Sequence, residues 1–159
     1  MTKWDMVVPA APEGAMNAGV ADVSAHVGHA RAHRAVFWDV NGEIRGKEAE
    51  NLVGSHIYLV EKGDMVEWRF TIAKVLPGHK MYKRWLDHDD FGKFFTESRK
   101  YSGRALDDVE SGDKCATLIL MTRPEPIDPI DVSEFTGQNG NKLKHPVRGS
   151  HRFVEPLKA

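Results

Sequence analysis

Hydrophobic and polar positions alternate most regularly from Ser55 to Leu76, and this stretch predicts two β-strands. Its apolar side chains recur at near two-residue spacing, the period at which side chains leave opposite faces of a sheet. A turn at Gly63 and Asp64 separates the strands, because glycine reaches positive φ and aspartate bonds its own backbone. The second strand, Met65 to Leu76, stops before Pro77, since proline cannot donate to a ladder. We therefore expect a long central strand here.

Shorter patterns on both sides predict the remaining elements. The expected elements are a short strand at Trp4 to Val8, a helix over Asp22 to His33, a buried strand over Arg34 to Val40, a surface connection or short helix over Gly42 to Gly54, a fully apolar mid-sheet strand over Lys114 to Thr122, one helical turn at Asp131 to Phe135, a loop over Thr136 to Lys144 and a final edge strand over Val147 to Val154. Residues 123–129 hold three prolines, which exclude regular structure and predict an extended crossing over the surface.

Length and composition predict a single domain over residues 1–159, with an irregular segment at 1–20. The chain is 41% hydrophobic and 28% charged, which suits one soluble core. Apolar runs fall short of the ~20 residues of a membrane helix, and the N-terminus lacks the order of a signal peptide, so we expect a cytoplasmic protein. The single Cys115 lies in an apolar run, which excludes an internal disulfide and predicts a buried thiol. No metal or other cofactor is expected.

Charge is distributed unevenly behind a net charge of -1. From Arg69 to Arg104 the chain carries nine basic and four acidic residues, and from Lys142 to Lys158 it carries five and one. Between these segments, Asp107 to Glu134 holds eight acidic and two basic residues. A fold that joins the basic segments would present a surface that attracts phosphate, whereas the alternative is ordinary solvated charge.

One segment is aromatic and basic at once. Tyr82 and Trp85 interleave with Lys80, Lys83 and Arg84, and charges on both sides make these two rings poor core residues. Bases stack on exposed aromatic rings with about 1–3 kcal/mol each, while basic side chains hold the adjacent phosphates. This segment is therefore the best local candidate for contact with nucleic acid.

Three histidines share one face of the expected N-terminal helix. His26, His29 and His33 follow the spacing i, i+3 and i+7, which could ligate a metal. The glutamate of an HExxH motif is missing. The expected alternative is a solvated or partner-facing histidine face.

Five features follow one another in a characteristic order. They are Trp38 at a strand end, the strand opening at Lys62 to Val66, the Tyr82 and Trp85 segment, the proline-led Pro126 to Phe135 and the closing Arg148 to Pro156. Their order resembles the PUA-like superfamily, with its EVE and YTH branches nearest. The match covers most of the chain from Arg34 to Pro156. It implies an α+β fold, a small, partly open mixed β-barrel with flanking helices.

The resemblance also implies a function, the recognition of a modified base that is flipped into an aromatic pocket. Methylated or hydroxymethylated cytosine and N6-methyladenine are examples of such bases. The pocket residues it implies are Trp38, Asp39, Asn41, Tyr82 and Trp85. Trp38 could instead be core, because it sits in an apolar run. The residues expected on the nucleic-acid backbone, in DNA or RNA, are Lys80, Lys83, Arg84, Arg148 and Arg152. A reader of this kind would act without catalysis, beside a nuclease or another effector protein of a restriction or modification system.

Two other functions stay open. The ASCH branch of the same superfamily includes hydrolases of modified nucleosides, for which the candidate residues near the pocket are Lys74, Thr71, Glu67 and Asp39. No GxSxG, P-loop or HExxH motif supports catalysis. In the second alternative, the acidic block from Asp107 to Glu134 docks a protein partner.

Overall fold

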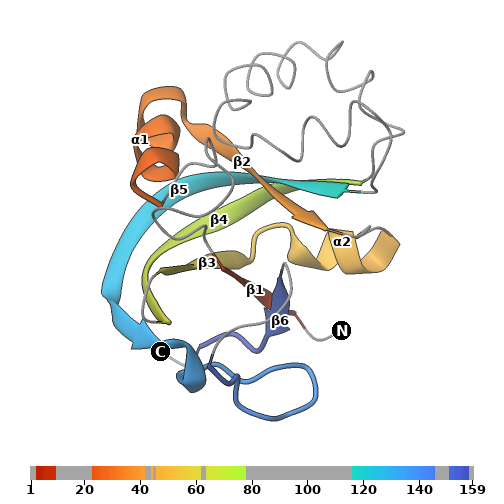
Figure 1. The fold of residues 1–159 in the computed structure, drawn as a ribbon. Coiled ribbons are helices and arrows are strands. Elements are labelled where there is room, and N and C mark those ends of the chain that lie inside the picture. The colour runs from red at the N-terminus through yellow and green to blue at the C-terminus, as the bar shows by residue number, and fades with distance from the viewer. Residues whose placement is uncertain are drawn as a thin grey trace.

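A computed structural model describes residues 3–9, 23–41, 44, 46–61, 64–77, 116–145 and 151–157. Together these residues form a six-stranded sheet with two helices and one 3-10 turn (Figure 1). The strands are β1 (Asp5–Pro9), β2 (Ala35–Asn41), β3 (His56–Glu61), β4 (Met65–Pro77), β5 (Ala116–Asp131) and β6 (Arg152–Val154). The helices are α1 (Val23–His33) and α2 (Gly46–Leu52), and the 3-10 turn is η2 (Val132–Glu134).

The sheet is mixed and strongly curved (Figure 1). Its strand order is β2-β5-β4-β3-β1-β6, with β1 parallel to β3 and every other pair antiparallel. The edge strands β2 and β6 do not pair within the described residues, so the sheet is not closed there. The expected α+β class is confirmed, in the form of an open mixed sheet.

The two strands predicted from alternation form the middle of this sheet. β4 is 13 residues long and lies between β5 and β3, which confirms the long central strand. At the turn that joins β3 to β4, Asp64 has a φ of 59° and its N–H donates to the Glu61 carbonyl at 3.1 Å. The other expected turn residue, Gly63, lies outside the described residues. The expected short N-terminal strand, α1, the helix before β3, the turn η2 and the edge strand β6 are also present.

The expectation of an irregular crossing through the prolines is wrong, because β5 continues to Asp131. β2 pairs with β5 only as far as Thr122. From Arg123 to Asp131, β5 has no pairing with β2 along this edge. A proline is tolerated where the missing N–H would have faced away from a partner strand. At the edge of β5 that pairs with β4, the register shifts before and after the Trp68–Pro126 pair. These irregularities accommodate the prolines within the pairing of the two strands.

Within the described residues, two apolar clusters pack the elements together. The larger cluster packs both helices and the segment before α2 against the sheet, through residues that include Val27, Trp38, Ile44, Leu52 and Phe70. The smaller cluster joins strands from both ends of the chain to η2, through residues that include Val7, Tyr58, Val132, Phe135 and Val154. No helix in the described part of the chain is long and apolar enough to cross a membrane.

Candidate functional site

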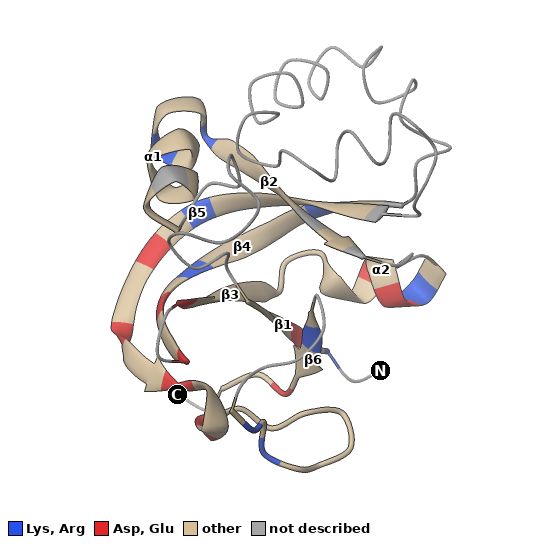
Figure 2. Cartoon of the chain, in the orientation of Figure 1, with Lys and Arg blue, Asp and Glu red and all other residues tan. Residues whose placement is uncertain are grey.

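Charges on the described surface separate along β5. Figure 2 shows basic positions at the junction of α1 and β2 and on the adjoining part of β5, and acidic positions further along β5. These acidic positions, Glu125, Asp128 and Asp131, belong to the predicted acidic block. Most of the predicted basic segment from Arg69 to Arg104, and Cys115 after it, lie outside the described residues.

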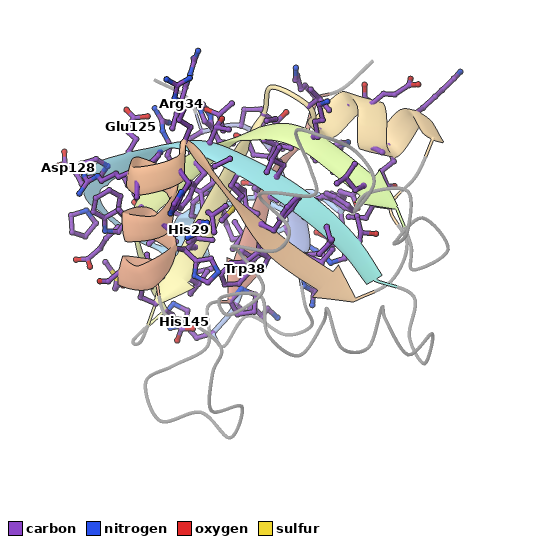
Figure 3. All side chains as sticks on the ribbon, turned by 90° about the horizontal axis from the view of Figure 1, so that it is seen from above. His29, Arg34, Trp38, Glu125, Asp128 and His145 are labelled. Atoms are coloured by element: carbon purple, nitrogen blue, oxygen red, sulfur yellow. The ribbon has the colours of Figure 1, made fainter. Side chains whose placement is uncertain are left out.

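The residues expected in the base pocket fall partly within the described structure. Trp38 lies on β2, is 8% exposed and belongs to the larger apolar cluster. Its ring centroid is 4.8 Å from that of His26, and it lies between α1 and β2 in Figure 3. Asp39 and Asn41 follow it on β2, where their backbones pair with β5. Tyr82 and Trp85 lie outside the described residues.

Of the residues expected on the nucleic-acid backbone, the structure describes one. Arg152 is exposed on β6, where it pairs with Val7 of β1. The other four lie outside the described residues, namely Lys80, Lys83, Arg84 and Arg148.

The expectation of a solvated histidine face on α1 is wrong for two of its three members. His26 is 1% exposed and His29 is 5% exposed, while the half-buried His33 stacks on His29 with 4.5 Å between ring centroids. The i, i+3 spacing that aligns the histidines also aligns them with the apolar side of the helix, which packs on β2 and β5. Within the described residues, no group of three potential metal ligands is close enough to hold an ion.

Three strand ends meet at one place on the sheet. Asn41, the last residue of β2, pairs with Ala116 at the start of β5, and Pro77, the last residue of β4, pairs with Thr117. The buried Thr117 hydroxyl accepts a hydrogen bond from the N–H of Ile44 at 2.9 Å, which ties the chain after β2 to this end. The polar residues of β2 therefore lie beside the point where the chain leaves β4.

A pocket of about 210 Å³ lies at another place, between α2 and β6. Its lining residues are Trp4, Glu48, Asn51, Leu52, Gln138 and Phe153. Two aromatic rings, two amides and one carboxylate suit a small planar group with polar edges. The pocket is smaller than the roughly 300–1,000 Å³ of pockets for drug-sized ligands, which limits it to about one ring system.

A row of polar side chains crosses three strands. Tyr58, Arg69 and Glu125 face one another across β3, β4 and β5, and Arg69 Nε donates to Glu125 Oε2 at 2.9 Å. This hydrogen bond lowers the pKa of the Glu125 carboxyl, whereas burial raises the pKa of the Tyr58 hydroxyl. Glu125 is thus an ionised partner of arginine and is poorly suited to act as a general base.

A buried carboxyl, Asp5, lies near this row on β1. It is 4% exposed and accepts a hydrogen bond from the backbone N–H of His56 at 2.9 Å. Burial raises the pKa of Asp5, and the hydrogen bond from His56 opposes that rise. The arrangement links β1 to β3 and is structural.

The residues considered for hydrolysis are spread over the sheet. Thr71 and Lys74 lie on β4, on either side of a register shift between Ile72 and Lys74. Glu67 is exposed on the same strand, within another register shift. Asp39 lies on β2, with β5 between it and β4, so its backbone is about 10 Å from that of β4 at the normal strand spacing.

Comparisons with known proteins identify a distant similarity of fold. No family model matches the chain, and no curated protein matches it. The crystal structure of ASCH from Zymomonas mobilis is similar, with a TM-score of 0.48 and 12% identity over 80% of this chain and 73% of that chain. Two mutants of the same protein give TM-scores of 0.42 and 0.40, at 12% and 14% identity. They cover 80% of this chain and 76% and 73% of theirs. ASCH domains belong to the PUA-like superfamily, but similarity at this level does not place the chain in it.

Proposed function

We propose that the chain is a nucleic-acid-binding module that takes a modified base into an aromatic pocket beside the end of β2. The observation that carries the proposal is the meeting of strand ends, where Asn41 of β2 and Pro77 of β4 pair with adjacent residues of β5. The aromatic and basic segment begins directly after Pro77. Lys80 follows Pro77 by three residues in the sequence, and Trp85 follows it by eight.

The proposed pocket combines a buried floor with residues of this segment. Trp38 is 8% exposed, so it would form the floor, while Tyr82 and Trp85 would supply the stacking faces. Asp39 or Asn41 would bind the edge of the base. Flipping a base costs a few kcal/mol of unstacking, which stacking and edge hydrogen bonds can offset.

Basic side chains would hold the phosphates on either side of the flipped base. Their candidates are Lys80, Lys83, Arg84, Arg148 and Arg152. Binding should weaken steeply with salt, because each phosphate contact releases condensed counterions. As a binding module, the chain would act through an effector such as a nuclease.

The test is fluorescence anisotropy with oligonucleotides of DNA and RNA, unmodified or carrying methylated or hydroxymethylated bases, at low and moderate salt. Wild-type protein should prefer one modified base, and Trp85→Ala should lose that preference because a stacking face is removed. The matched control is Trp4→Ala, which alters the pocket between α2 and β6. A modified-base preference that survives Trp85→Ala contradicts the pocket assignment. If only Trp4→Ala loses the preference, the base binds instead in the pocket between α2 and β6.

Hydrolysis of a modified nucleoside is the second candidate function. Thr71 and Lys74 flank a register shift in β4, and such bulges often re-aim side chains next to active sites. If this function holds, the protein should convert a modified nucleoside, and Lys74→Met should abolish the reaction. Turnover that persists in both Lys74→Met and Asp39→Asn would exclude these roles.

A further inference from the structure

Three arginines gather where α1 passes into β2. Arg31 lies in the last turn of α1, and Arg34 is the residue between α1 and β2. Ala35 pairs with Thr122 of β5, so Arg34 and Arg123 are the residues next to this pair on the two paired segments. Basic positions accordingly appear together at this junction in Figure 2.

The backbone at two of these positions is unfavourable for arginine. Arg34 has a φ of 73° and Arg123 a φ of 53°, in the left-handed region where glycine carries no steric penalty. Both side chains are exposed, and within the described part of the chain neither has an ion pair or hydrogen bond. Adjacent like charges across a strand pair are themselves destabilising. Local stability therefore does not account for arginine at these two positions.

Within the described residues, no salt bridge is found for these three arginines. The Arg31 guanidinium lies over the Trp68 ring, 5.1 Å from its centroid, which orients it without neutralising it. Glu125 lies two residues beyond Arg123, but Arg69 already binds its carboxylate at 2.9 Å. In Figure 3, Arg34 projects outward from the junction of α1 and β2.

We propose that Arg31, Arg34 and Arg123 form a second phosphate-binding surface that holds the nucleic-acid backbone away from the base pocket. Guanidinium groups bind phosphate through forked, charge-assisted hydrogen bonds, and the strained backbone of Arg34 and Arg123 is of the kind that functional sites retain. This inference rests on the proposed nucleic-acid binding.

The two surfaces lie at opposite ends of β2. From Arg34 to Asn41 the strand rises about 23 Å at roughly 3.3 Å per residue. This distance corresponds to about seven base pairs of duplex at 3.4 Å each. A nucleic acid that fills the base pocket would reach the arginines by running along β2, so short ligands would engage the pocket alone.

The experiment measures anisotropy of a labelled duplex of about 14 base pairs, twice that span, over a series of salt concentrations. The double variant R34Q/R123Q should bind more weakly than wild type, and its slope of log affinity against log salt should be smaller by about 2, since each lost phosphate contact removes about 0.9. The matched control, K3Q/K47Q, removes the same charge from two exposed positions elsewhere and should keep the wild-type slope.

A second variant separates binding from folding. R34G/R123G removes both charges and places glycine at the two positive φ values, so its melting temperature should equal or exceed that of wild type while its affinity falls. If the wild type binds and either arginine variant keeps its full affinity and slope, the arginine surface is wrong. Equal weakening by K3Q/K47Q also overturns it, because the effect would then be one of net charge. Failure of the wild type to bind any oligonucleotide overturns the proposed function itself.

Discussion

His145 makes two contacts with carboxylates at the ends of β4 and β5. Its Nε2 lies 2.6 Å from Asp131 Oδ1, and its Nδ1 lies 3.6 Å from Asp64 Oδ2. Ser133 also donates to Asp131 Oδ1, from its backbone N–H at 2.8 Å and its hydroxyl at 2.7 Å. The pKa of Asp131 is lowered to about 2, mainly by the Ser133 hydrogen bonds, and the hydrogen bond to Asp131 raises the pKa of His145.

The first residue-scale prediction concerns the titration of His145. Because its pKa is raised, the stabilisation from its protonated form is complete below the ordinary histidine pKa and is lost as pH rises through the raised value. Asp131→Asn removes the charge but keeps an oxygen that can accept from Ser133, so the His145 pKa should fall toward its ordinary value. NMR titration of the imidazole measures this change. With Glu134→Gln as the control, an unchanged His145 pKa in Asp131→Asn would contradict the ion pair.

The backbone conformation of single residues was predictable from the sequence at some positions and not at others. The turn between β3 and β4 was predictable from Gly63 and Asp64, and Asp64 adopts the positive φ. The positive φ values of Arg34 and Arg123 could not be predicted from the residue type, since arginine has no preference for that region. They follow from how α1 joins β2 and from the irregular ladder between β4 and β5, which are properties of the assembled sheet.

At the scale of elements, the packing of α1 on β2 depends on Trp38. This side chain is 8% exposed, belongs to the larger apolar cluster and contacts the ring of the buried His26 in a tilted arrangement. Trp38→Ala should lower the free energy of unfolding by about 3–5 kcal/mol, because it leaves a large cavity between helix and sheet. Trp38→Phe keeps an aromatic ring and should be less destabilising.

Urea denaturation followed by circular dichroism measures both effects. Val53→Ala is the control, since Val53 is 43% exposed and exposed substitutions usually change stability by less than about 0.5 kcal/mol. A Trp38→Ala variant as stable as the control would show that Trp38 is not a core residue. The expected loss makes Trp85→Ala the cleaner test of base binding, because Trp38→Ala would disturb folding and binding together.

Elements differ in how far their patterns could be interpreted. The alternation from Ser55 to Leu76 predicted β3 and β4, although β3 is buried on both faces from Ile57 to Val60. The continuation of β5 through Pro126 could not be predicted from its residues, since tolerance of proline depends on where β2 stops pairing. The buried face of α1 was missed because His26 and His29 count as polar in a hydrophobic pattern.

At the scale of the whole molecule, the sheet brings distant segments together. The pocket between α2 and β6 takes its lining from four separate parts of the chain, so no local pattern could have predicted it. The expected pocket near Trp38 was inferred from the order of motifs alone, and its chemistry depends on residues from Lys80 to Trp85. Topology adds that the end of β2 lies near the end of β4, after which that segment follows in the sequence.

The two ends of the chain are also joined, because β1 lies between β3 and β6. Val7 of β1 and Val154 of β6 are fully buried in the smaller cluster with Tyr58 and Phe135. We therefore expect the chain to unfold as one domain, in a single cooperative transition. Loss of β6 would uncover β1 inside the sheet, so local unfolding of the C-terminal end should propagate to the rest of the fold.

Val154→Ala tests this coupling. Removing two buried methyl groups should cost about 1–3 kcal/mol and should move the whole transition, because β6 seals the edge of β1. Far-UV circular dichroism reports the sheet and helices, while near-UV circular dichroism reports the packed aromatic residues. The two signals should change at the same denaturant concentration in wild type and variant, as two-state unfolding requires. Separate transitions, or a shift of one signal alone, would divide the chain into independently folding parts.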